Sequence, residues 1–89
     1  MTTIRYMRRP EVLQKIGVSN STLHSQILKG LFVPPISLGA RSVGWLEHEV
    51  NAVLIMRAQG KSEGEIKILV RRMVKERKQA QIKEGASNA

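Results

Sequence analysis

The side chains that usually carry catalysis or hold metals are scarce in this sequence. The chain has no Asp and no Cys, which excludes disulfides, thiolate zinc sites and thiol catalysis. His24 and His48 fall on different predicted helices, and Glu47 and Glu49 would point about 200° apart on one helix. We therefore predict neither an enzyme nor a metal or cofactor site.

A different chemistry, hydrogen bonding to nucleic-acid bases and phosphates, suits two other groups of side chains. Short polar side chains on one helix face can read base edges. The candidates for DNA binding on that helix are Asn20, Ser21, Thr22, Ser25, Gln26 and Lys29. The cationic candidates outside it, which suit phosphate, are Arg8, Arg9 and Arg41. Contacts to phosphate or to a partner protein are expected from Lys67, Arg71, Lys75 and Lys78. The alternative for each group is a solvated surface without a partner.

The charge balance favours a polyanionic partner. Fifteen Lys and Arg residues against seven Glu residues give a net charge of +8 over 89 residues, which makes nucleic acid the first candidate. Residues 1–30 and 61–89 each carry a net charge of +4, whereas residues 31–60 are neutral overall. The longest apolar run, residues 52–56, is far too short to span a bilayer, so we expect a cytoplasmic protein with no membrane partner.

Two short predicted helices, joined by a glycine turn, must position the polar candidates. Pro10 suits the first turn of a helix and Gly17 the left-handed stop, so the first helix covers residues 10–16. Ser19 suits the N-cap of the second helix, which Gly30 ends. The core-facing side of this second helix is predicted to hold Leu23, Ile27 and Leu28, with His24 half-buried at its edge.

The segment that follows predicts a β-hairpin, or wing. Two adjacent prolines hold residues 31–35 extended. Apolar and small residues then alternate on either side of a loop formed by Gly39, Ala40 and Arg41. The alternating apolar residues are Ile36, Leu38, Val43 and Trp45. Arg41 is therefore expected at the wing tip, where it suits a phosphate or the minor groove, and Trp45 is expected in the core. Gly44 is expected to mark a close approach of two backbone segments.

Two further helices complete a single domain, residues 1–79. One begins near Leu46 and ends by Gly60. The other covers residues 62–79, where Ser62 and Glu65 match a capping box. Its apolar stripe consists of Ile66, Leu69, Val70, Met73 and Val74. Either the preceding helix or the same helix of a second molecule must cover this stripe, and we favour the preceding helix. Residues 80–89 lack periodicity and are predicted to form a disordered tail.

These elements predict a fold that is mainly α with a small β-hairpin, namely a winged helix-turn-helix followed by a C-terminal helix. The runs PEVLQKIGVSNSTLHSQILKG and FVPPISLGARSVGWLEHEV resemble the AlpA family of phage and prophage regulators. The resemblance covers residues 6–57. It implies a MerR/excisionase-like winged helix-turn-helix that binds double-stranded DNA, as a transcriptional regulator or as a directionality factor for prophage excision. Such a protein would be associated with the bacterial nucleoid when bound.

Two features depart from the family pattern. The family usually has an aromatic residue at His24 and a tryptophan at Val53, so packing here is expected to be lighter. It also usually has a basic residue near Asn20 or Ser25, where this chain has none. The resemblance therefore implies that the wing and the C-terminal cations compensate for a weakly charged reading helix.

Three functions remain open from the sequence. The first is sequence-specific DNA binding, with self-association as molecules line up on neighbouring sites. The second is a protein-binding regulator that sequesters a response regulator or a recombinase through the surface carrying Ile68. The third, RNA binding, is disfavoured because three aromatic residues leave little for stacking unpaired bases.

Overall fold

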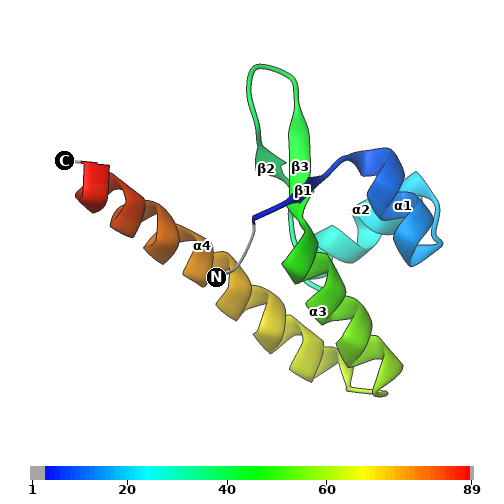
Figure 1. The fold of residues 1–89 in the computed structure, drawn as a ribbon. Helices are drawn as coiled ribbons and strands as arrows, with labels where there is room; N and C mark the ends of the chain where they lie inside the picture. Colours follow the sequence, from blue (N-terminus) through cyan, green and yellow to red (C-terminus); the bar gives the residue numbers. More distant parts are fainter. Residues whose placement is uncertain (1–3, 89) are drawn as a thin grey trace.

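The computed structural model describes residues 4–88, with side chains described for residues 4–77. The chain folds into four helices and a three-stranded antiparallel sheet within these residues, which confirms the winged helix-turn-helix (Figure 1). In chain order the elements are β1 (Tyr6–Met7), α1 (Arg9–Ile16), α2 (Asn20–Leu28), β2 (Ile36–Ser37), β3 (Val43–Leu46), α3 (Glu47–Ala58) and α4 (Glu63–Asn88).

The ends of α1 and α2 follow the predicted capping chemistry. Gly17 takes a φ of 71°, which is the left-handed conformation that ends α1. Ser19 caps α2, and its Oγ accepts a hydrogen bond from the backbone N–H of Thr22 at 3.2 Å. Gly30, with a φ of 77°, then lets the chain turn away from α2. Both helices of the helix-turn-helix are therefore fixed by local sequence.

The wing forms as predicted, and β3 is the central strand of the sheet. The strand order is β1-β3-β2, with Ile36 opposite Gly44 and Met7 opposite Trp45. Figure 1 shows the hairpin projecting away from the helices. A side chain at Gly44 would place its Cβ 2.7 Å from Leu38 Cδ1 and 3.3 Å from the Met7 carbonyl oxygen. The predicted close approach at Gly44 is confirmed, and it joins β1 to the wing.

The core lies where α1, α2, α3 and the sheet meet. Its fully buried large side chains include Val12, Leu23, Phe32, Trp45, Val50 and Val53. The Trp45 indole N–H donates to the Val33 carbonyl oxygen at 3.0 Å, so the prediction of a core tryptophan is confirmed and its polar atom is satisfied.

Two predictions about the inner side of α2 are wrong. Leu28 is 74% exposed, and His24 is exposed instead of half-buried. At about 100° per residue, Leu28 lies roughly 140° from Leu23 around the helix, so it cannot share the core-facing side. The chain reverses direction at Gly30, and Phe32 fills the core in place of Leu28.

The apolar stripe of α4 packs within the same chain, as expected. Ile66, Val70 and Met73 are buried in the core that α3 also lines, and Figure 1 shows the two helices side by side. We predicted disorder from residue 80, whereas the backbone of α4 is helical to Asn88. Ala, Gln, Lys and Glu have high intrinsic helix propensity, which favours a helix even without an apolar stripe. No helix in the described part of the chain is long and apolar enough to cross a membrane.

Candidate nucleic-acid interface

Apart from Leu28, the exposed part of α2 is polar and nearly uncharged. Ser21 and Thr22 are exposed, and both of their hydroxyls lie within hydrogen-bonding distance of Ser19 Oγ, at 3.3 and 3.0 Å. Ser25 is half-buried, and Lys29 is exposed where the helix ends. These four predicted DNA-binding residues therefore lie on accessible or partly accessible turns of α2.

The side-chain amides of Asn20 and Gln26 on α2 are hydrogen-bonded to arginines of the same chain. Arg9 Nη1 donates to Asn20 Oδ1 at 2.9 Å, and Arg57 Nη2 donates to Gln26 Oε1 at 2.6 Å. Gln26 lies about 60° from Leu23 around the helix, on the flank that faces α3, which explains its half-buried position. Asn20 remains exposed, whereas half-buried Gln26 is set apart from the rest of the predicted reading face.

Arg57 ties α3 to α2 and to the start of the wing. Besides Gln26, its guanidinium donates to the Leu31 carbonyl oxygen at 3.2 Å and lies 5.9 Å from the centre of the Phe32 ring. Burial lowers the pKa of Arg57 from its usual value, because removing water penalises the charged form. This arginine therefore sets the orientation of α2 relative to α3.

The wing and α1 bring three predicted phosphate contacts into one region. Arg41 is exposed at the wing tip and makes no hydrogen bond or ion pair with any other residue whose side chain is described. Arg8 is exposed, and its Nη2 reaches Ser42 Oγ beside the tip at 3.5 Å. Arg9 packs over Trp45 with its guanidinium carbon 5.3 Å from the ring centre. Cations thus run from the wing to the N-terminal end of α2.

The basic residues of α4 do not share one environment. Lys67 is half-buried, and its Cγ would lie 3.8 Å from a Cβ placed on Gly30, so its stem lies against the end of α2. Arg71 and Lys75 are exposed. The side chain of Lys78 lies outside the described residues. Lys67 is therefore placed next to the helix-turn-helix.

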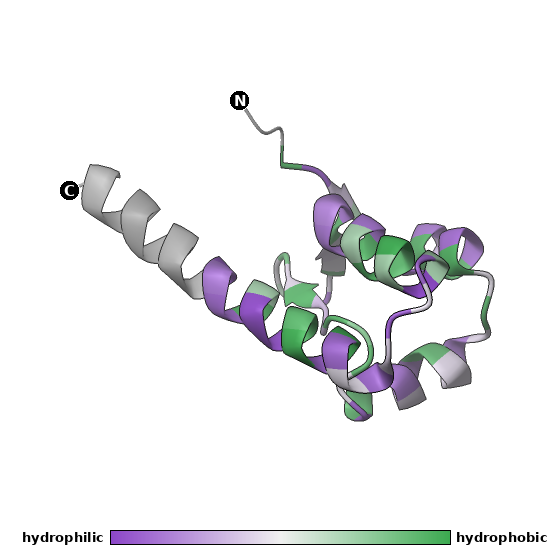
Figure 2. Ribbon diagram, turned by 90° about the horizontal axis from the view of Figure 1, so that it is seen from below, coloured by the Kyte–Doolittle hydropathy of each residue, from purple (hydrophilic) through white to green (hydrophobic). Residues whose placement is uncertain are grey.

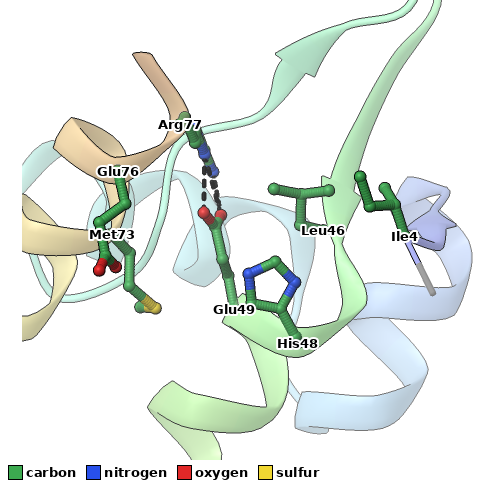
Figure 3. A pocket seen from close by; sticks show the side chains of 7 residues that line it. All are labelled: Ile4, Leu46, His48, Glu49, Met73, Glu76 and Arg77. Carbon is green, nitrogen blue, oxygen red and sulfur yellow. Dashed lines mark hydrogen bonds and ion pairs between the residues drawn. The ribbon is translucent and has the colours of Figure 1, made fainter. Parts of the chain in front are cut away.

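Sequence reasoning missed a buried ion pair between α3 and α4. Arg77 Nε donates to both carboxylate oxygens of Glu49 at 3.0 Å, and Arg77 Nη2 donates to Glu49 Oε1 and, at 2.9 Å, to the Pro34 carbonyl oxygen (Figure 3). The side chain of Glu49 is 2% exposed and that of Arg77 is 12% exposed. The sequence does indicate that both charges face the core. Glu49 precedes Val53 by four residues and Arg77 follows Met73 by four, so each charge continues the apolar stripe of its helix.

A hollow of about 290 Å³ opens beside this ion pair, and its wall is mostly apolar. Figure 3 shows the residues that line it, which are Ile4, Leu46, His48, Glu49, Met73, Glu76 and Arg77. Across the part of the chain that the structure describes, no three His, Cys, Asp or Glu side chains gather in a way that could hold a metal ion. Two of the ionisable groups at this hollow, Glu49 and Arg77, join α4 to α3.

Comparison with known proteins identifies relatives among phage regulators. Residues 5–53 match the family described as prophage CP4-57 regulatory protein (AlpA). The uncharacterized protein ORF88 of Enterobacteria phage P4 is 42% identical over 64 residues, which cover 72% of this chain and 73% of that protein. The DNA-binding transcriptional activator AlpA of Escherichia coli K12 is 30% identical over 64 residues, covering 65% of this chain and 91% of the relative. No solved structure matches the chain.

Proposed function

This chain belongs to the AlpA family of prophage regulatory proteins, and on that basis we propose that it is a double-stranded DNA-binding regulator. The observation that carries the proposal is the pairing of an exposed polar helix, α2, with an exposed arginine at the tip of an adjoining wing. A helix of this kind fits the major groove, and a wing arginine fits a phosphate or a narrow minor groove.

Within this proposal, α2 supplies the sequence readout. Ser21, Thr22 and Ser25 can donate and accept hydrogen bonds at base edges, and Lys29 can reach a guanine or a phosphate. Asn20 and Gln26 have the positioning role, since Arg9 and Arg57 hold their side-chain oxygens. Discrimination between DNA sequences therefore rests mainly on hydroxyl groups.

The cations around α2 supply most of the affinity. Arg8, Arg9 and Arg41 contact phosphates beside the wing, and Lys67, Arg71 and Lys75 add positive potential from α4. Phosphate contacts position a protein on the duplex without reading sequence. A small domain with one cation on its reading helix needs such contacts, because phosphate neutralisation supplies most non-specific affinity.

The proposed biological role is control of prophage genes, and a directionality role in prophage excision would use the same duplex contacts. The E. coli relative is described as a DNA-binding transcriptional activator, which favours gene control. A duplex partner would place the protein at the nucleoid of the bacterial cytoplasm.

Selection from a randomised duplex library, followed by binding measured with fluorescence anisotropy, tests this function. The expected result is an enriched duplex that binds at least tenfold more tightly than a shuffled duplex or a single-stranded RNA of the same sequence. Ser25→Ala should reduce that ratio while Lys15→Ala, a change of an exposed residue on α1, should not. Equal affinity for all three nucleic acids would overturn sequence-specific duplex binding, and tighter binding of RNA would favour the RNA alternative.

A further inference from the structure

The side of α4 that points away from the core carries an exposed apolar residue between charges of both signs. Ile68 is 65% exposed. Glu65, Arg72 and Glu76 are exposed too, and at about 100° per residue they share an arc of roughly 80° with Ile68. Lys61, just before the helix, joins them through its Nζ, which lies 3.9 Å from Glu65 Oε2. We call these five residues the α4 outer face.

A shallow hollow adjoins this face where α4 meets α3. Its volume is about 240 Å³, and its lining residues are Met56, Glu65, Ile68, Leu69 and Arg72. Figure 2 shows an apolar turn of α4 between hydrophilic turns. Ile68 therefore lines a partly apolar depression that can receive a side chain from another molecule.

The order of charges along this face is complementary to itself. From the N-terminal end the residues are Lys61, Glu65, Ile68, Arg72 and Glu76, so the signs run plus, minus, apolar, plus, minus. A two-fold axis between Ile68 and Leu69 places Glu65 opposite the partner's Arg72. The same axis places Lys61 opposite the partner's Glu76. Each charge among these five residues then meets an opposite charge, and Lys75, which is also exposed about 20° from Ile68, falls opposite the partner's Ser62.

We propose that the occupant of this face is a second copy of the chain, docked with the two α4 helices antiparallel. A surface patch that is complementary to itself under two-fold rotation is what an isologous dimer requires. An unrelated partner would need no such symmetry in the charge order. The apolar centre also pairs with itself, since Ile68 of one copy enters the hollow beside Leu69 of the other.

The net charge of the chain sets when this contact forms. Two copies of charge +8 repel each other in dilute solution, and one helix face buries less area than a standard stable interface. Bound phosphates neutralise that repulsion, and neighbouring sites on one duplex raise the effective concentration of the second copy. The contact therefore forms in free solution only at high protein concentration, and at lower concentration between molecules that share a polyanion.

Disulfide trapping tests the interface without relying on DNA binding. The chain has no cysteine, so Ile68→Cys introduces a single thiol next to the proposed axis. Leu28→Cys provides the matched control, because Leu28 is another exposed apolar residue, on α2. At about 100 µM protein in an oxidising buffer, the Ile68→Cys chain should form covalent dimers at least fivefold faster than the Leu28→Cys chain. Equal rates would overturn the proposal and leave the face to a partner of another kind.

Charge exchange in the Ile68→Cys chain tests the antiparallel geometry. Arg72→Glu should slow dimer formation severalfold, because it places two acidic pairs across the axis. Arg71→Glu removes the same charge from the neighbouring exposed position and should slow it little. Mixing the Arg72→Glu chain with a Glu65→Arg chain should restore the rate, since each copy then meets its opposite charge. Equal effects of the two Arg→Glu changes, or no recovery in the mixture of folded chains, would overturn the antiparallel arrangement.

Discussion

The wing and the seam between α3 and α4 use arginine in opposite ways. Arg41 is exposed at the wing tip and has no partner among the side chains that the structure describes. Arg77 is 12% exposed and is held by Glu49 and by the Pro34 carbonyl oxygen. Removing Arg41 should therefore cost binding alone, whereas removing Arg77 should cost the fold.

This difference shows that the count of fifteen Lys and Arg residues overstates the number of cations available to a partner. Arg57 joins α3 to α2, and Arg77 joins α4 to α3, so neither guanidinium is available to a partner. Arg5 pairs with Glu47 at 2.7 Å. The cations left for a polyanion are the exposed ones near the wing and along α4.

The largest loss of stability is expected when the buried pair of Glu49 and Arg77 is broken. Arg77→Ala leaves the Glu49 carboxylate buried without its cation, and we expect it to lower the free energy of unfolding by about 3–5 kcal/mol. Urea unfolding followed by circular dichroism measures this loss. The double variant Glu49→Leu with Arg77→Met should recover most of it, because a buried pair can be replaced by apolar residues at little cost. A loss below about 1 kcal/mol for Arg77→Ala would show that the pair is dispensable.

A smaller effect is expected at the base of the wing. Gly44→Ala forces a Cβ against Leu38 and the Met7 carbonyl oxygen, so we expect a loss of about 1–3 kcal/mol in unfolding free energy. Gly64→Ala is the control, since Ser62 Oγ at 3.9 Å is the one neighbour near its Cβ and α4 is helical there. That change should stabilise the protein by about 0.5–1 kcal/mol in thermal unfolding. Similar losses for both variants would contradict the close approach at Gly44.

Local sequence predicted the parts of the fold that depend on local chemistry. The left-handed Gly17, the Ser19 cap, the wing loop with Arg41 and the Ser62 cap of α4 are each decided within a few residues. Trp45 was predicted correctly because alternation along a strand assigns each side chain to one face. The apolar stripe of α4 was also predicted correctly, because apolar residues at intervals of three and four lie on one side of a helix.

The failures have two sources, helix geometry and contacts between distant elements. Leu28 is exposed because it lies about 140° from Leu23 around α2, whereas Gln26 is held away from the reading face because α3 supplies Arg57 to its flank. The pair of Glu49 and Arg77 joins residues from separate helices, and neither residue alone indicates a partner. Which members of the candidate site are accessible was therefore decided by tertiary contacts that the sequence pattern does not encode.

Gln26 and Ser25, neighbours on α2, are expected to have different roles, one in stability and one in DNA reading. Gln26→Ala removes the acceptor for Arg57, and we expect a loss of about 1 kcal/mol in unfolding free energy. Ser25→Ala should leave stability nearly unchanged and should act on discrimination between duplexes. Chemical denaturation of both variants, together with anisotropy on the selected duplex, separates the two roles. Equal stability of the two variants would show that Gln26 does not stabilise the fold and is available to read DNA.

The smallest effect on stability is expected for Arg41→Ala, which should leave urea unfolding unchanged. It should weaken every duplex alike, because a phosphate contact carries no sequence information. Lys15→Ala, which removes an exposed cation from α1, should weaken binding less. Loss of affinity for only the selected duplex would show that Arg41 reads bases.

Binding of a duplex through phosphate contacts must weaken as salt concentration rises. If the exposed cations neutralise about five phosphates, the logarithm of the association constant should fall with the logarithm of salt concentration at a slope near ~−4.5. Arg41→Ala should make that slope shallower by about 0.9, whereas urea unfolding of the same variant stays at the wild-type midpoint. Duplex affinity that does not change with salt would contradict the account.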